Sequence, residues 1–240
     1  MIFVIGIATF LSTLLGGLFA LHLKDRLHLV LGFSAGAILG VAFFDLIPEA
    51  FELASTQYSI TLIASLIGLG FAVYMLLDRL VLLHSHNEDT EEGHSTHRGP
   101  VGAGSISFHS MLDGLGIGLA LQISTAMGAI LAVAVFAHNF SDGINTVNMI
   151  LKNKGTRGQA AKWLLADALA PTVGIFITFF ISVSQTSLGL LLALFAGFLL
   201  YVGASDLLPE SHHAHPVRWT TLSTILGMVV LYAIISFAQI

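Results

Sequence analysis

Residues 126–150 read AMGAILAVAVFAHNFSDGINTVNMI, a long apolar run with one histidine and one aspartate near its middle. A helix needs about 20 predominantly apolar residues to cross the hydrocarbon core of a bilayer, so this stretch is long enough to span one. It contains no lysine or arginine, and its single acidic residue is Asp142. The stretch therefore predicts a membrane-spanning α-helix that carries polar groups inside it.

The composition of the whole chain extends this interpretation to most of its 240 residues, of which 55% are hydrophobic and 10% charged. A soluble domain normally carries about 25% charged residues, so the deficit indicates that most of the surface faces lipid. Eight segments have the length and composition of a span: 1–22, 28–54, 58–83, 101–122, 126–150, 159–183, 187–210 and 217–238. We expect an all-α membrane protein, a single polytopic domain over 1–240 with eight transmembrane helices in a bundle. The polar residues 84–100 predict a flexible loop rich in His and acidic residues between the third and fourth spans.

The basic residues fall at alternate connections between these spans. They are Lys24, Arg26, Arg79, Arg98, Lys152, Lys154, Arg157, Lys162 and Arg218. By the positive-inside rule these connections are cytoplasmic, so both termini are expected to be extracytoplasmic. We expect a multi-pass protein of the cell membrane (plasma or inner membrane) with the lipid bilayer as a partner. Nucleic-acid binding would need a clustered cationic face, which the sequence lacks.

Two matching polar boxes lie in neighbouring predicted spans. FHSMLDG (108–114) pairs His109 with Asp113, and FAHNFSDG (136–143) pairs His138 with Asp142. Residues four apart project from one helix face, about 5–6 Å apart at Cβ. The connection between the two helices is very short, so we expect antiparallel neighbours whose polar faces can bring together two imidazoles and two carboxylates. That set suffices for four-coordinate zinc, and the absence of cysteine leaves only nitrogen and oxygen ligands.

The cost of burying these carboxylates favours a bound cation. An aspartate at the centre of a spanning helix costs about 2.5–3.5 kcal/mol on the insertion scale. No lysine or arginine lies in the middle of the spans to neutralise Asp113, Asp142 and Asp167. The alternative for a single intramembrane histidine is a hydrogen-bonded packing residue, but two matching boxes favour a ligand set.

A second repeated motif lies near the ends of two other spans, as DLIPEAFE (45–52) and DLLPESHH (206–213). The two helices run in opposite directions, so their motifs fall at opposite membrane faces. Inverted repeats are typical of secondary transporters, so we predict inverted-repeat character with a mouth on each side. The outer mouth is predicted at Asp45, Glu49 and Glu52, and the inner mouth at Asp206, Glu210, His212 and His213. The alternative is that these are helix-end carboxylates facing water.

The predicted loop 84–100 holds four histidines among acidic residues: His84, His86, His94 and His97. Histidine-rich tracts bind metal ions weakly through imidazole, which indicates metal receipt or sensing at the cytoplasmic face. The alternative is a generic flexible acidic loop.

These features together resemble the ZIP (Zrt/Irt-like) divalent-metal transporters over the whole chain. The resemblance implies a helical bundle, commonly dimeric, that moves zinc or iron towards the cytoplasm. It implies divalent metal as substrate (zinc foremost, with iron, manganese, cadmium and cobalt as further candidates), no prosthetic group and no enzymatic activity. Ser110, Asn139 and Asp167 are implied as auxiliary metal contacts. Relatives carry acidic residues where Asn139 and Ala170 stand here, so we expect one primary metal site of His109, Asp113, His138 and Asp142.

Two other functions compete with transport. An intramembrane metal-dependent hydrolase would use the same ligands to hold a catalytic zinc with an open position for water, but no general base is evident beside the boxes. A metal sensor would bind the ion without moving it. The glycines of GFSAGAILG (32–40) and those at 114 and 118 indicate close helix packing within one protomer, with a homodimer interface as the alternative.

Overall fold

The computed structural model of the chain describes residues 2–20, 27–86, 98–181, 183–212 and 217–238, and these are helical almost throughout. The helices are α1 (Ile2–Phe19), α2 (Leu27–Val41), the π-helix η1 (Ala42–Leu46), α3 (Ile47–Ala54), α4 (Ile60–His86), α5 (Arg98–Ile123), α6 (Thr125–Lys152), α7 (Arg157–Thr178), α8 (Gln185–Tyr201), the π-helix η2 (Val202–Leu207), α9 (Leu208–His212) and α10 (Val217–Ala238).

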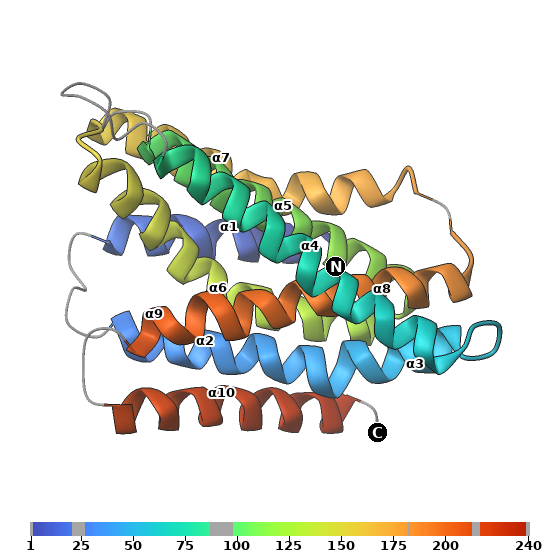
Figure 1. Cartoon of the computed structure of the whole chain (residues 1–240). Helices are drawn as coiled ribbons and strands as arrows, with labels where there is room; N and C mark the ends of the chain where they lie inside the picture. The colour runs from blue at the N-terminus through green and yellow to red at the C-terminus, as the bar shows by residue number, and fades with distance from the viewer. Residues whose placement is uncertain (1, 21–26, 87–97, 182, 213–216, 239–240) are drawn as a thin grey trace.

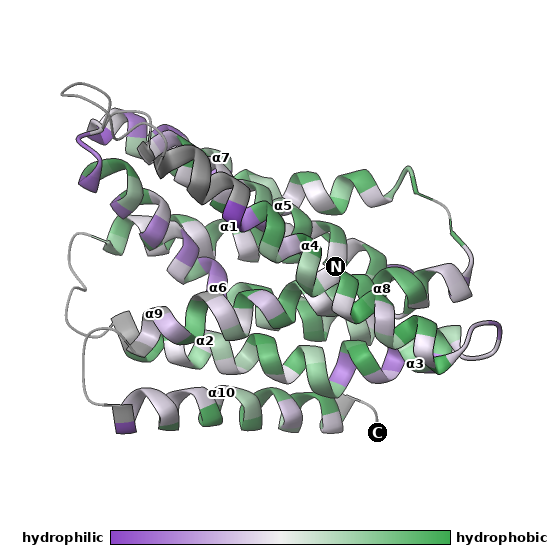
Figure 2. Ribbon diagram, in the orientation of Figure 1, coloured by the Kyte–Doolittle hydropathy of each residue, from purple (hydrophilic) through white to green (hydrophobic). Residues whose placement is uncertain are grey.

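Eight of the helical stretches are long and apolar enough to cross a membrane, which confirms the eight predicted spans. Large apolar side chains lie exposed along them, as a lipid environment requires, and Phe3 on α1 is 86% exposed. Figure 2 shows apolar residues along most of the helices and hydrophilic ones gathered where α6 turns into α7. The N- and C-terminal labels lie toward the same end of the bundle in Figure 1, as an even number of spans requires.

The loop predicted over 84–100 is shorter than expected at both ends. Helix α4 continues to His86 and α5 begins at Arg98, so helical backbone extends into the predicted loop from each side. His94 and His97 lie outside the described residues. His84 and His86 stand on the last turn of α4.

Helices α5 and α6 are joined by a single residue, Ser124. Its hydroxyl oxygen accepts a hydrogen bond from the Met127 amide at 3.0 Å and so caps the start of α6. The extended backbone at Ser124 lets the chain reverse direction at once. The two helices that carry the His–Asp boxes are therefore antiparallel neighbours, as predicted.

The helices pack into two groups of four spans. Helices α1, α5, α6 and α7 pack mainly on one another, and we call this group the site bundle. The flanking bundle consists of α2–η1–α3, α4, α8–η2–α9 and α10, which also pack mainly on one another. The bundles meet chiefly where α2 lies against α6, with smaller contacts of α5 on α4 and α8. Figure 1 shows α10, α2 and α9 side by side, with α6, α5 and α7 successively farther from α10.

Pairs of glycines hold helices together within each bundle. At each one, an added Cβ would overlap a backbone carbonyl oxygen of the partner helix, so only glycine permits the approach. The four pairs are Gly16 with Gly143 (α1 and α6), Gly114 with Gly174 (α5 and α7), Gly36 with Gly227 (α2 and α10), and Gly70 with Gly197 (α4 and α8). Each pair joins two helices of the same bundle, which confirms that glycines 36 and 114 pack within one protomer.

Candidate metal site

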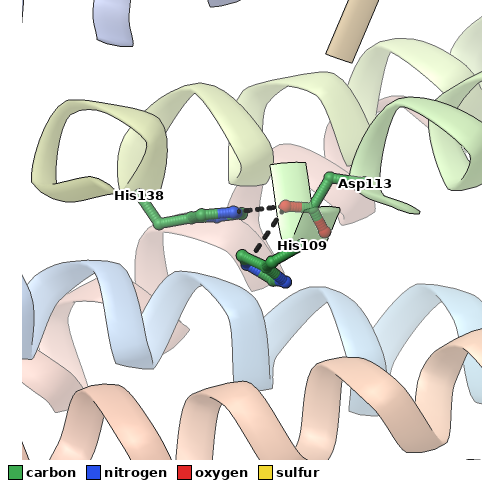
Figure 3. Close-up of side chains that lie close together, drawn as sticks. All are labelled: His109, Asp113 and His138. Carbon is green, nitrogen blue, oxygen red and sulfur yellow. Dashed lines mark hydrogen bonds and ion pairs between the residues drawn. The ribbon is translucent and has the colours of Figure 1, made fainter. Parts of the chain in front are cut away.

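The two His–Asp boxes meet inside the site bundle. His109 and Asp113 lie on α5, His138 and Asp142 lie on α6, and all four side chains are buried. One nitrogen of each histidine and one oxygen of Asp113 lie within 4.8 Å of one another. Figure 3 shows the three side chains converging, with the Asp113 carboxylate between the two imidazoles.

A single carboxylate oxygen links both rings. Asp113 Oδ2 lies 2.9 Å from His138 Nε2 and 3.2 Å from His109 Nε2. The other oxygen, Asp113 Oδ1, is buried and has no hydrogen-bond partner among the described residues. A buried carboxylate oxygen without a donor is costly, so this oxygen is a candidate ligand atom for a cation.

These separations suit a tetrahedral zinc ion. Two ligand atoms that each lie about 2.1 Å from such an ion are about 3.4 Å apart. The separations of the box carboxylates from imidazole nitrogens are 2.9, 3.2 and 3.7 Å, which bracket that value. The contacts of Asp113 with both imidazoles therefore lie within about half an ångström of the separation expected between two ligands of one zinc ion.

The second ring nitrogen of His138 is held by the backbone. Nδ1 lies 3.1 Å from the carbonyl oxygen of Ala134, one turn earlier in α6. An imidazole that donates Nδ1–H to a carbonyl keeps the Nε2 lone pair directed at the site. The sequence did not single out Ala134, because a backbone acceptor leaves no pattern in residue types.

Asp142 lies at the edge of the cluster. Its Oδ2 is 3.7 Å from His138 Nε2, and the side chain is buried. It does not belong to the group of three whose ligand atoms lie mutually close. The structure thus brings together three of the four predicted ligands. The fourth, Asp142, is near His138 but outside this group.

Asp167, on α7, is completely buried behind the cluster. Its Oδ1 accepts a hydrogen bond from the Ser110 hydroxyl at 2.7 Å, and its Oδ2 accepts one from the Thr146 hydroxyl at 3.0 Å. Ser110 follows His109 on α5, and Thr146 lies one turn after Asp142 on α6. Asp167 therefore ties the helices that carry both boxes to α7. The sequence did not single out Thr146, although its spacing of four from Asp142 places both near one helix face.

Asn139 is the third predicted auxiliary contact. It is fully buried, and neither its amide nitrogen nor its carbonyl oxygen has a hydrogen-bond partner among the described residues. A buried amide without partners is rare in folded proteins. Its position next to His138 keeps it a candidate auxiliary contact.

A π-helix runs into the first two residues of each DLxPE motif and ends two residues before its proline. Segment η1 covers Asp45 and is followed by Pro48, and η2 covers Asp206 and is followed by Pro209. Proline cannot donate to the helical ladder and its ring crowds the preceding turn, which favours a wider local turn. This feature, which the two motifs share, was not predicted from the sequence.

The predicted outer mouth changes from buried to exposed along its length. Asp45 is buried, with Oδ2 unpartnered among the described residues, while Glu49 is half-buried and Glu52 is exposed. For the predicted inner mouth, the structure describes the backbone of Asp206, Glu210 and His212 only, on η2 and α9. His213 lies outside the described residues.

Eight apolar spans around a buried cluster of imidazoles and a carboxylate define a multi-pass membrane protein that can hold a metal ion. The ZIP zinc transporter family matches the chain over residues 1–105 and 103–239, so the chain belongs to that family. It is 29% identical over 257 residues to the zinc transporter ZupT of Corynebacterium glutamicum, covering 96% of this chain and 97% of that protein. It is 25% identical to ZupT of Corynebacterium aurimucosum, covering 92% and 91% of the two chains, and 25% identical to ZupT of Shigella dysenteriae, covering 94% and 91%.

Family membership decides two questions raised by the sequence: the family resemblance and the hydrolase alternative. The resemblance to the ZIP transporters is confirmed over the whole chain. The family consists of transporters and not of enzymes, so the hydrolase alternative is set aside.

Proposed function

We propose that the chain carries zinc towards the cytoplasm through the cluster of His109, Asp113 and His138, with Asp142 as the fourth ligand. The observation that carries this proposal is the convergence of two imidazoles on one buried carboxylate inside the bundle. The Asp113 carboxylate lies 3.2 Å from His109 and 2.9 Å from His138, near the separation of two ligands in a zinc complex.

Charge balance supports a divalent cation at this position. The carboxylates of Asp113, Asp142 and Asp167 are buried within spanning helices, where an unpaired charge is expensive. All lysines and arginines of the sequence lie at or near the ends of the spans. A divalent cation supplies the positive charge that no lysine or arginine supplies.

Binding of the ion also exchanges protons. The 2.9 Å contact of His138 Nε2 with Asp113 Oδ2 needs a shared proton, because two lone pairs repel at that distance. A metal ion replaces this proton, so zinc binding and protonation of the cluster compete. The Nδ1 contact with Ala134 keeps the ring oriented during the exchange.

The route we propose runs from the outer mouth to the cluster and on to the inner mouth. The graded exposure of Glu52, Glu49 and Asp45 supports a path along which an ion loses hydration water before it reaches the bundle interior. The inner mouth is formed by Asp206, Glu210 and the histidines at 212 and 213. The distribution of the basic residues supports the direction, with both termini outside.

An inverted repeat is supported by the arrangement of the helices. Exchanging α1 with α7, α2–α3 with α8–α9, α4 with α10, and α5 with α6 maps every reciprocal glycine pair onto another such pair. The same exchange maps one π-helical DLxPE motif onto the other. We propose that movement of the site bundle against the flanking bundle exposes the cluster to each side in turn.

Other parts of the proposal come from the sequence and the family alone. Iron, manganese, cadmium and cobalt are further candidate substrates, and the histidines at 84, 86, 94 and 97 are proposed to receive the ion in the cytoplasm. The plasma or inner membrane is the proposed location. A homodimer stays a prediction.

Radiometal uptake into proteoliposomes tests the proposed site. We expect His138→Ala to abolish saturable uptake of radioactive zinc and Asp142→Ala to reduce it. Val133→Ala, a change at a lipid-exposed position of α6, should leave uptake as in the wild type. Full uptake by the His138→Ala variant would refute the site, and zinc binding without flux by the wild type would support a sensor.

A further inference from the structure

A cavity of 290 Å³ lies where the two bundles meet, between α4 and α5. It is lined by Tyr74, Leu77 and Asp78 of α4 and by Val101, Gly104, Ser105 and Phe108 of α5. Six waters occupy about 180 Å³ at about 30 Å³ each, so a hydrated divalent cation fits inside. The cavity lies at the membrane side on which α4 ends and α5 begins, away from the predicted outer mouth at the far end of α2–α3.

One tyrosine separates this cavity from the metal cluster. Tyr74 lines the cavity, and its ring also meets the ring of His109 edge-on, with centroids 5.7 Å apart and planes at 82°. His109 follows Phe108, another lining residue. The distance from the cavity to the metal ligands is thus spanned by a single aromatic ring.

The flanking bundle holds this ring in place. Tyr74 packs against Tyr201 and Phe198 of α8, with ring centroids 5.5 and 5.7 Å apart. The Tyr201 hydroxyl donates a 2.8 Å hydrogen bond to Asp78 Oδ2. This bond fixes the orientation of the Asp78 carboxylate, which lines the cavity. Tyr74 therefore belongs to one bundle and His109 to the other, so relative movement of the bundles changes the contact that closes the cavity.

We infer that Tyr74 is the barrier between the metal cluster and the cavity, and that the cavity receives the hydrated divalent cation as it leaves the cluster. Asp78 is the only acidic residue among the described residues that line the cavity, and its carboxylate offers a passing cation one negatively charged contact in a mostly apolar lining. Movement of the Tyr74 ring away from His109 opens a path for the ion from the cluster to the cavity. This inference rests on the proposed function, because it takes the cluster as the ion's starting point.

The absence of cysteine allows a direct test of the cavity. A single Ser105→Cys variant in proteoliposomes is treated with a charged, membrane-impermeant methanethiosulfonate reagent from each side in turn. We expect labelling only from the side where α4 ends, and loss of zinc flux after labelling. The cysteine-free wild type and a Ser107→Cys variant, two residues along and not lining the cavity, control for other effects of the reagent. Complete modification of Ser105→Cys with unchanged flux would show that the ion does not pass through the cavity.

The barrier itself is tested with Tyr74→Ala. Vesicles loaded with zinc should lose it several-fold faster through this variant than through wild type, while zinc binding to the purified variant stays saturable because the ligands remain. Val73→Ala, a lipid-exposed change next to it, should not leak. Equal leak rates for the two variants would overturn the role of Tyr74. Full uptake by a His138→Ala variant would instead overturn the metal site. The effect of labelling Ser105→Cys on zinc flux is measured independently, so the two failures can be told apart.

Discussion

Gly143 connects the packing of the site bundle to the geometry of the metal cluster. It follows Asp142 directly, and its Cα faces the backbone of α1. In a Gly143→Ala variant the new methyl carbon would overlap the Thr13 carbonyl oxygen and lie 2.8 Å from the carbonyl carbon. Carbon atoms pack at about 3.5–4.0 Å, so α6 and α1 must separate by about 1 Å.

This separation should affect both stability and zinc affinity. Overpacking of this kind typically costs about 1–3 kcal/mol of stability. Because α6 carries His138 and Asp142, the shift also moves two ligands relative to those on α5. Metal–ligand distances tolerate changes of about 0.2 Å, and loss of the support around a metal ligand typically costs about 10–100-fold in affinity. We expect a comparable loss of zinc affinity.

Thermal unfolding in detergent and zinc titration of the purified protein measure the two effects. Gly68→Ala is the matched control, because Gly68 is an exposed helical glycine with no atom within 4 Å of the added carbon. The control should be neutral or slightly stabilising, since alanine is favoured over glycine in a helix by about 1 kcal/mol. If Gly143→Ala kept both the wild-type unfolding midpoint and the wild-type zinc affinity, the proposed link between packing and ligand geometry would be wrong.

Three other outcomes are expected. Asp142→Asn should weaken zinc binding less than Asp113→Asn, because Asp113 lies 2.9 and 3.2 Å from the two imidazoles whereas Asp142 lies 3.7 Å from His138; titration of both variants checks the order, and a reversed order contradicts the geometry. Asp167→Ala leaves two buried hydroxyls without their acceptor, so it should lower the free energy of unfolding by about 1–3 kcal/mol, and unchanged denaturation in detergent would speak against those hydrogen bonds. Zinc affinity should fall as the pH is lowered, because protons compete for the imidazole nitrogens; affinity that is independent of pH would exclude imidazole ligands.

The spans and the ligand pairs could be predicted because simple periodicities fix them. The length of an apolar run is set by the thickness of the bilayer, so eight runs give eight helices. The spacing of four from His109 to Asp113 places both on one helix face wherever the helix packs. The short connection at Ser124 then leaves α6 few places other than beside α5.

The π-helices could not be predicted from proline alone. Pro48 and Pro209 each follow a π-helix, whereas Pro171 lies inside α7 without one. The difference depends on how each helix packs, which the local sequence does not encode. The same limit applies to Asp167, because its two hydroxyl partners are set by the rotation of α7 against α5 and α6.

The two boxes carry more information than a pair of ligands. A residue advances about 100° around an α-helix, so the glycine after each aspartate points about 100° away from it. In the structure that direction leads to the neighbouring helix: Gly114 meets the carbonyl of Pro171 on α7, and Gly143 meets that of Thr13 on α1. The aspartate faces the metal site while the adjacent glycine admits the helix that supports it. The shared unit is therefore histidine, aspartate and glycine together, since ligand position and helix packing are set within about one and a half turns of the same helix.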